Sequence, residues 1–225
     1  MKFTYYGHST FALELGSKVF LFDPFITGND LAKQIDIDSL KADYILVSHG
    51  HSDHTTDLVR VAKNTGALVI SNFEIISWLE SQGVSNVHPM NFGTYDFEFG
   101  TLTYMHAQHS SSFSDGSYAG NPGGFILKSN HGSFYYSGDT SLMLDMQLVP
   151  HYAKVDVAIL PVGGNFTMNV KDALKATEFI KCDYVIGVHF DTFGYIKINH
   201  EASVKLFSDA GKKLLLPGVG KSYEV

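Results

Sequence analysis

The chain has 225 residues, a formal net charge of −7, eleven histidines and one cysteine. The negative charge argues against a general nucleic-acid binder, because a phosphate backbone attracts a basic surface. Hydrophobic residues make up 44% and charged residues 17% of the chain, so it can bury a large core and is not disordered. The single cysteine, Cys182, provides neither an intramolecular disulfide nor a thiolate zinc site. The histidines are therefore the unusual feature of this composition.

The first residues, MKFTYYGHSTFALEL, lack the uninterrupted apolar region and the cleavage site of a signal peptide. No apolar run of about eighteen residues follows, so we expect no membrane-spanning segment. The default expectation is a cytoplasmic protein. No repeat, linker or low-complexity tract divides the sequence, which predicts a single domain over residues 1–225.

Short aromatic or β-branched runs at the start of the chain predict an antiparallel meander over residues 2–6, 10–15 and 19–22. A continuous apolar run at 42–48 is typical of a strand that is buried on both faces. A second buried strand is expected at 67–71. Helical patterns follow these two strands, one beginning near Leu58 and one covering residues 74–81.

The rest of the chain first returns to antiparallel strands and then alternates strands with helices. Strands are expected at 94–99, 101–107, 124–128, 133–137, 155–162, 184–188 and 213–216, and helices at 171–182 and 201–210. The segment 110–123 is rich in Ser, Gly and Asn and long for a connection. It is either a mobile insertion or a functional loop that gates the substrate. Two β-rich halves with helices predict an α/β fold, a four-layer αββα sandwich of two mixed β-sheets.

The sharpest chemical signal is the run His49-Gly-His51-Ser-Asp53-His54. Three imidazoles and a carboxylate packed this closely without a metal would be unsatisfied or mutually repelling polar groups. The run follows the C-terminal end of a predicted buried strand, where sites in open α/β sheets collect. In an extended loop, His49 and His51 can point toward one ion while Asp53 and His54 turn toward a second.

Three further candidates, His109, Asp139 and His189, each lie at or just after the end of a predicted strand. A lone histidine at a strand end is more often a core or surface residue than a ligand. The prediction of a metal site therefore depends on the whole set, because a shared catalytic edge requires exactly such positions at the ends of several strands.

The motifs SHGHSDH, AQHS, SGDT and GVHF, in this order, resemble the metal motifs of the metallo-β-lactamase superfamily. The segments GHSTF at 7–11 and PVGGNFTM at 161–168 are similar to a branch of short metal-dependent hydrolases related to ascorbate-phosphate lactonase. The resemblance implies an αββα sandwich that binds two divalent metal ions, Zn²⁺ first, with Mn²⁺ or Ni²⁺ as alternatives.

The resemblance also implies a role for each matching residue. The first metal would be held by His49, His51 and His109, the second by Asp53, His54 and His189, and Asp139 would bridge the two. Asp53, His54 and Asp139 would also be the catalytic residues. Two divalent ions lower the pKa of a shared water toward ~7, which gives a hydroxide that can attack an ester, lactone or phosphoester.

Three other polar residues are weaker candidates. His8 lies in a predicted turn and is either a contact to substrate or to a metal ligand, or an ordinary turn residue. Asn165 follows two glycines and could offer its amide to substrate. Asp23 ends the third predicted strand, where a hydrogen bond to a metal-binding histidine is plausible.

The leading hypothesis is a dinuclear-metal hydrolase that acts on a small-molecule substrate. The main alternative is a metal-dependent phosphodiesterase or nuclease, against which the acidic charge counts. A redox role is disfavoured because di-iron members of the superfamily have Glu where this chain has His51. A non-catalytic metal-binding module is the last alternative. A homo-oligomer is left open, since the apolar segment 142–149 can pack internally or against a second copy.

Overall fold

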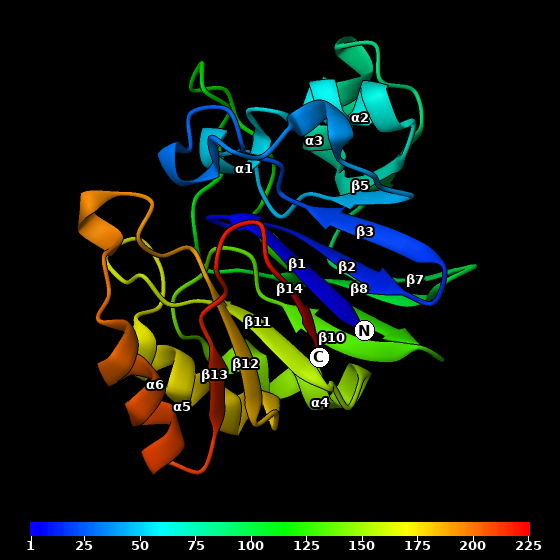
Figure 1. Cartoon of the computed structure of the whole chain (residues 1–225). Coiled ribbons are helices and arrows are strands. Elements are labelled where there is room, and N and C mark those ends of the chain that lie inside the picture. Colours follow the sequence, from blue (N-terminus) through cyan, green and yellow to red (C-terminus); the bar gives the residue numbers. More distant parts are fainter. The chain divides into compact units, whose positions relative to one another are not determined.

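The computed structural model describes residues 1–225 (Figure 1). The chain forms two compact units. Unit 1 comprises residues 1–91, 110–122 and 218–225, and unit 2 comprises residues 92–109 and 123–217. The single domain expected from the sequence stays a prediction. No helix combines the length and the apolar character that crossing a membrane requires.

Unit 1 contains a seven-stranded mixed sheet in the order β14-β1-β2-β3-β4-β5-β6. The predicted meander is confirmed, because β1, β2 and β3 pair antiparallel, whereas β3 to β6 run parallel. The strands are β1 (Lys2–Gly7), β2 (Thr10–Leu15), β3 (Lys18–Phe22), β4 (Tyr44–Leu46), β5 (Leu68–Asn72), β6 (Val87–Met90) and β14 (Ser222–Glu224).

Helices cover one face of this sheet. They are α1 (Ser52–Thr55), α2 (Leu58–Thr65) and α3 (Phe73–Ser81), with single 3-10 turns η1 (Asp30–Ala32) and η2 (Ile37–Ser39). Leu21, Ile45 and Val69 on the sheet form one buried core with apolar residues of α2 and α3, such as Leu58 and Ile75. Burying each such aliphatic side chain contributes about 1.5–3 kcal/mol. Figure 1 shows α3 beside β5, which it contacts.

Unit 2 contains the second seven-stranded mixed sheet, in the order β13-β12-β11-β10-β9-β8-β7. Its antiparallel part, β7 to β10, continues into a parallel part, β10 to β13. The strands are β7 (Gly93–Phe97), β8 (Gly100–His106), β9 (Gly123–Ser129), β10 (Gly132–Tyr136), β11 (Val157–Pro161), β12 (Tyr184–Val188) and β13 (Lys213–Leu215).

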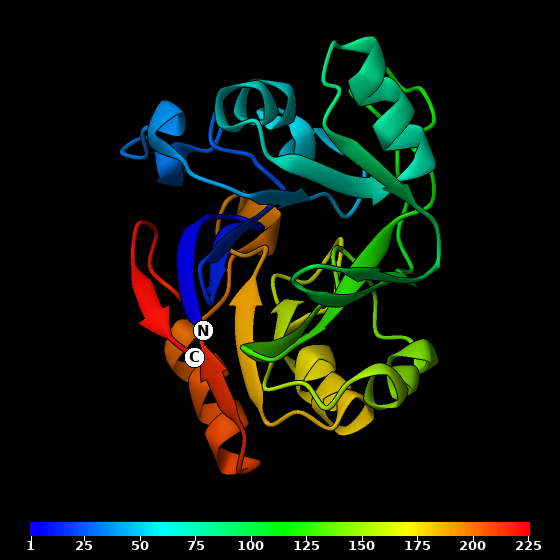
Figure 2. The same cartoon turned by 90° about the vertical axis from the view of Figure 1, so that its right-hand side faces the viewer.

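The helices of unit 2 follow its parallel strands. They are α4 (Val149–Tyr152), α5 (Val170–Ile180) and α6 (His200–Asp209), with 3-10 turns η3 (Leu144–Leu148) and η4 (Gly194–Ile196). The side chain of Asn169 accepts hydrogen bonds from the backbone at the start of α5, and Asn199 does the same for α6. Figures 1 and 2 show α6 alongside β13.

The apolar segment at 142–149 is divided between the core and the surface of unit 2. Met143, Met146 and Val149 are buried, whereas Leu144 and Leu148 are exposed. Internal packing therefore accounts for three of the six apolar side chains in the segment. The contact with a second copy stays a prediction.

The sequence patterns missed four short elements. The strand β6 contains Pro89, and β6 lies at the edge of its sheet, where a proline costs no ladder hydrogen bond on the open side. The strand β14 has three residues, and the helices α1 and α4 have four residues each. Elements this short are set by their tertiary contacts and leave no periodic pattern in the sequence.

Candidate metal centre

The histidine motif of unit 1 begins where β4 ends. Val47 still donates its backbone N–H to Ile70 of β5 at 3.1 Å, after which the chain leaves the sheet. His51 then occupies the position before the first residue of α1, and His54 lies in the last turn of that helix. His49 and His54 are fully buried, whereas the side chain of Asp53 is 25% exposed.

Asp23, at the end of β3, is the buried carboxylate that holds this loop. One of its oxygens, Oδ1, accepts from the backbone N–H of Ser48 at 2.7 Å. The other, Oδ2, lies 2.9 Å from Nδ1 of His54. Because an ionised carboxylate only accepts hydrogen bonds, Nδ1 of His54 carries a proton, and Nε2 is the nitrogen through which the neutral form of the ring would bind a metal. This is the arrangement of a metal-binding histidine that is fixed by an outer carboxylate.

Ser48 extends the same arrangement to His49. The Ser48 hydroxyl donates to Oδ2 of Asp23 at 2.6 Å, so its oxygen can only accept from Nδ1 of His49, which lies 3.0 Å away. His49 is therefore also left with Nε2 as an acceptor. One carboxylate sets the ring state of two histidines, directly for His54 and through Ser48 for His49.

The ring of His51 lies next to the ring of His49. Nδ1 of His51 lies 3.0 Å from Nε2 of His49, and Nε2 of His51 lies 3.3 Å from the hydroxyl of Ser110. Two imidazole nitrogens this close either share a proton or bind one cation between them. If a cation binds the two facing nitrogens, Nε2 of His51 keeps its proton and donates a hydrogen bond to the hydroxyl oxygen of Ser110.

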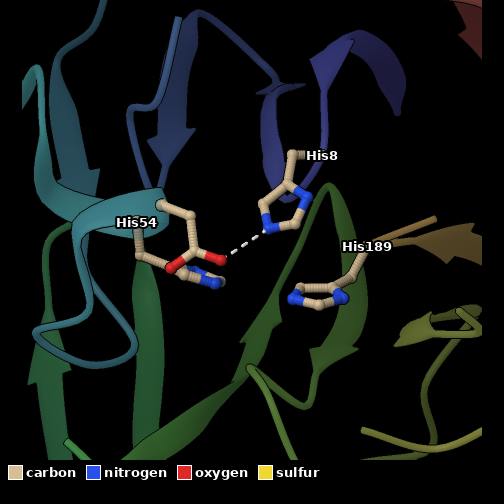
Figure 3. A group of neighbouring side chains, drawn as sticks. His8, His54 and His189 are labelled. Carbon is tan, nitrogen blue, oxygen red and sulfur yellow. Dashed lines mark hydrogen bonds and ion pairs between the residues drawn. The ribbon is translucent and has the colours of Figure 1, made fainter. Parts of the chain in front are cut away.

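His8 approaches the same loop from the turn between β1 and β2. Its Nε2 lies 3.1 Å from Oδ2 of Asp53 (dashed line in Figure 3), and its side chain has no exposed surface. His8, Asp53 and His54 each place a possible ligand atom within 4.8 Å of the others. Unit 1 thus brings together all five of its predicted site residues, which are His8, His49, His51, Asp53 and His54.

Unit 2 brings together its own three predicted ligands. Nε2 of His189 lies 3.0 Å from Oδ2 of Asp139, and Nε2 of His109 lies 3.7 Å from the same oxygen. The three residues follow β12, β10 and β8, respectively. Asp139 and His189 are almost fully buried, and the His109 side chain is 14% exposed. One carboxylate oxygen and two imidazole nitrogens in this arrangement are suitable ligand atoms for a divalent cation.

Asn165 is placed differently from the other candidates. It lies in the loop between β11 and α5, exposed, with a left-handed backbone (φ 58°) and without a side-chain hydrogen bond. Its assignment as a substrate contact stays a prediction.

The loop at 110–122 packs closely onto the rest of unit 1. Phe113 stacks on Trp78 of α3 with ring centroids 4.6 Å apart, and Asn72 donates to the carbonyl of Ala119 at 2.9 Å. A Cβ at Gly50 would lie 2.2 Å from Cβ of Ala119, so only glycine fits between the metal motif and this loop. Of the two interpretations from the sequence, these contacts favour a functional loop over a mobile insertion.

Ser48 and Ser110 are supporting residues that the sequence reasoning missed. Serines are common in loops, so their residue type alone gives no sign of this role. The available signal was their place beside the histidines, in SHGHSDH for Ser48 and in AQHS for Ser110.

The chain is similar to known proteins over most or all of its length. A family described as a β-lactamase superfamily domain matches residues 2–189. A UPF0173 metal-dependent hydrolase of Flavobacterium johnsoniae is 54% identical over 226 residues and covers 100% of both chains. A second, from Christiangramia forsetii, is 53% identical over 227 residues with the same coverage. A solved metallo hydrolase from Ignicoccus hospitalis has a TM-score of 0.88 and 30% identity, covering 100% of this chain and 98% of that one.

The chain belongs to the β-lactamase superfamily and, within it, to the UPF0173 metal-dependent hydrolases. It is a metal-dependent hydrolase, and the predicted fold class, two mixed β-sheets with helices of the metallo-β-lactamase type, is confirmed. The resemblance to ascorbate-phosphate lactonase stays a prediction.

The donor chemistry of both units fits a divalent metal. Imidazole nitrogens and carboxylate oxygens without a thiolate suit zinc, manganese, nickel and iron alike. In unit 1, Nδ1 of His54 donates to Asp23 and Nδ1 of His49 donates to Ser48, so a metal would bind both rings through Nε2 in their neutral form.

Proposed function

We propose that the chain is a hydrolase with a dinuclear metal centre, and that its substrate is a small ester, lactone or phosphoester. The proposal uses the seven residues predicted from the sequence as ligands, with zinc as the first choice of metal. They are His49, His51, Asp53, His54, His109, Asp139 and His189.

The observation that carries the proposal is the fixed ring state of His49 and His54. A buried carboxylate, Asp23, accepts a hydrogen bond from Nδ1 of His54 and, through Ser48, orients Nδ1 of His49, so that a metal would bind each ring through Nε2. Metal-binding histidines are typically held by such an outer carboxylate, which orients the ring and directs its second nitrogen toward the metal. The arrangement supports a ligand role for both rings.

When bound, two divalent cations lower the pKa of a water molecule between them toward neutrality and polarise the substrate oxygen under attack. The residues of the chain fix the geometry. His49 and His54 present neutral nitrogens, while Asp53 and Asp139 supply negative charge that favours cation binding. Asp53 is partly exposed, so in this proposal it is the carboxylate that can also hold a proton during the reaction.

The phosphodiesterase or nuclease is the second candidate, and its support comes only from the shared motif. The net charge of −7 argues against a nucleic-acid substrate, because Lys and Arg together number 16 against 23 Asp and Glu. A small uncharged or singly charged substrate fits this balance better. The cytoplasm as the working compartment belongs to the same proposal.

The test is a panel of lactones, esters, thioesters, β-lactams and bis(p-nitrophenyl) phosphate, assayed separately with Zn²⁺ and Mn²⁺. We expect turnover of an ester or lactone that requires added metal and is lost in Asp139→Ala and His54→Ala. Turnover of the phosphodiester alone would favour the second candidate instead. Far-UV circular dichroism of both variants controls for loss of the fold, and retained turnover in either would contradict the assigned roles.

A further inference from the structure

The residue that the metal motif leaves unexplained is His8. Its side chain is fully buried, and its Nε2 lies 3.1 Å from Oδ2 of Asp53. We propose that His8 is a positioning residue that donates this hydrogen bond and thereby holds the Asp53 carboxylate in the orientation that binds metal. The inference rests on the proposed function, in which Asp53 is a ligand.

The backbone of His8 indicates that its place is specific. His8 has φ 56° and Gly7 has φ 112°, and the pairing of β1 with β2 is irregular between Tyr5 and Gly7. A left-handed backbone is unfavourable for histidine, and such residues persist where the surroundings demand them, often at functional sites. A glycine at position 8 would avoid this cost, yet it would place no side chain against Asp53.

The surroundings hold the imidazole in place. The hydroxyl of Tyr5 donates to the carbonyl of His8 at 2.9 Å, which ties the turn to β1. The ring meets Phe25 edge-on, with centroids 5.6 Å apart. Since water has no access to the ring, His8 offers Asp53 a hydrogen bond with little competition from solvent.

Asp53 is the ligand that most needs such support. It lies in the first turn of the four-residue helix α1 and its side chain is 25% exposed. An exposed carboxylate on a short helix can rotate, and binding a metal then costs the entropy of fixing it. A preformed hydrogen bond to a buried donor removes part of this cost in advance.

The same turn also supports Asp23. Thr10 donates its hydroxyl to the carbonyl of Asp23 at 2.7 Å and accepts from the backbone N–H of Phe25 at 2.9 Å. His8 and Thr10, two residues apart in the chain, therefore form hydrogen bonds with Asp53 and Asp23, respectively. In this proposal the GHST motif at 7–10 supports the metal motif. The side chain of His8 contacts Asp53 and is fully buried, so a substrate has no access to it.

Three variants at position 8 separate positioning from packing. In His8→Gln the amide nitrogen can reach the place of Nε2 and keep the donor. In His8→Phe the volume is kept but the donor is lost. In His8→Asn the side chain tolerates the left-handed backbone but is too short to reach Asp53. The matched control is His200→Phe, which removes the hydrogen bond of His200 to Asp191 at the start of α6.

The measurement is metal affinity by competition with a chromophoric chelator, alongside the melting temperature of the metal-free protein. We expect His8→Phe and His8→Asn to weaken one class of metal site by about 10- to 100-fold, and His8→Gln to restore most of the affinity. The control should bind like the wild type. Unchanged affinity in His8→Asn, or His8→Gln as weak as His8→Phe, would overturn the inference.

The wild-type measurement separates this inference from the proposed function. Wild-type protein that binds no metal would contradict the proposed function and the inference together. Wild-type protein that binds two ions and hydrolyses substrate, with His8 variants of equal affinity, would overturn the inference alone.

Discussion

Oδ2 of Asp23 lies 2.9 Å from Nδ1 of His54, and both side chains are fully buried. The carboxylate comes from the end of β3 and the imidazole from α1, so the hydrogen bond joins two elements that are 31 residues apart in the chain. Its chemical consequence is that Nδ1 of His54 carries a proton, so a metal would bind this ring through Nε2. Its structural consequence is that the motif loop cannot turn away from the sheet.

Asp23→Asn should weaken metal binding by about 10- to 100-fold while the fold is retained. The amide has nearly the shape of the carboxylate, but its NH₂ group can donate to Nδ1 of His54 and so move the ring proton to Nε2. Chelator competition measures the affinity. Asp43→Asn is the matched control, since that carboxylate accepts only a surface hydrogen bond from the backbone of Val19. Equal affinities in the two variants would contradict the role assigned to Asp23.

Gly50→Ala should lower the free energy of unfolding by about 1–3 kcal/mol, because the added methyl group overlaps Ala119. Urea unfolding measures the loss. The double variant Gly50→Ala with Ala119→Gly should recover part of it, since the overlapping atom is removed. Gly194→Ala is the control, because a Cβ there meets no atom within 4 Å. A loss as small in Gly50→Ala as in Gly194→Ala would show that loop 110–122 does not press on the metal motif.

The single cysteine tests the packing of unit 2. Cys182 is 4% exposed, and burial raises the pKa of its thiol above the ordinary value. The folded protein therefore keeps the thiol protonated at a pH where the unfolded chain already forms thiolate. We expect slow alkylation by iodoacetamide at pH 8 and a large acceleration in urea. The raised pKa also means that stability falls as the pH rises above the pKa of the unfolded thiol. Equally fast alkylation with and without urea would contradict the buried position.

Much of the fold was predictable because its signals are local. The meander at the start of the chain shows its strands as aromatic and β-branched runs, and the buried strand before His49 shows as an unbroken apolar run. The ligand candidates were predictable for a related reason. Sites collect at the C-terminal ends of strands, so His49 and His189 could be placed as soon as their strands were placed.

The supporting residues could not be predicted in the same way. The hydroxyl of Ser110 meets His51 across 59 residues of chain, and no local pattern encodes such a contact. His8 was recognised as a candidate from its turn, but its burial and its bond to Asp53 depend on how β1 and β2 meet α1. Short elements such as β6 and β14 were missed because they have no sequence pattern of their own. Their pairing with neighbouring strands defines them.

The most direct test of the central claim is the metal content of protein purified without chelator, measured by inductively coupled plasma mass spectrometry against the protein concentration. We expect close to two divalent ions per chain, with a lower metal content in His54→Ala and Asp139→Ala. One ion per chain, or none, would contradict the dinuclear centre.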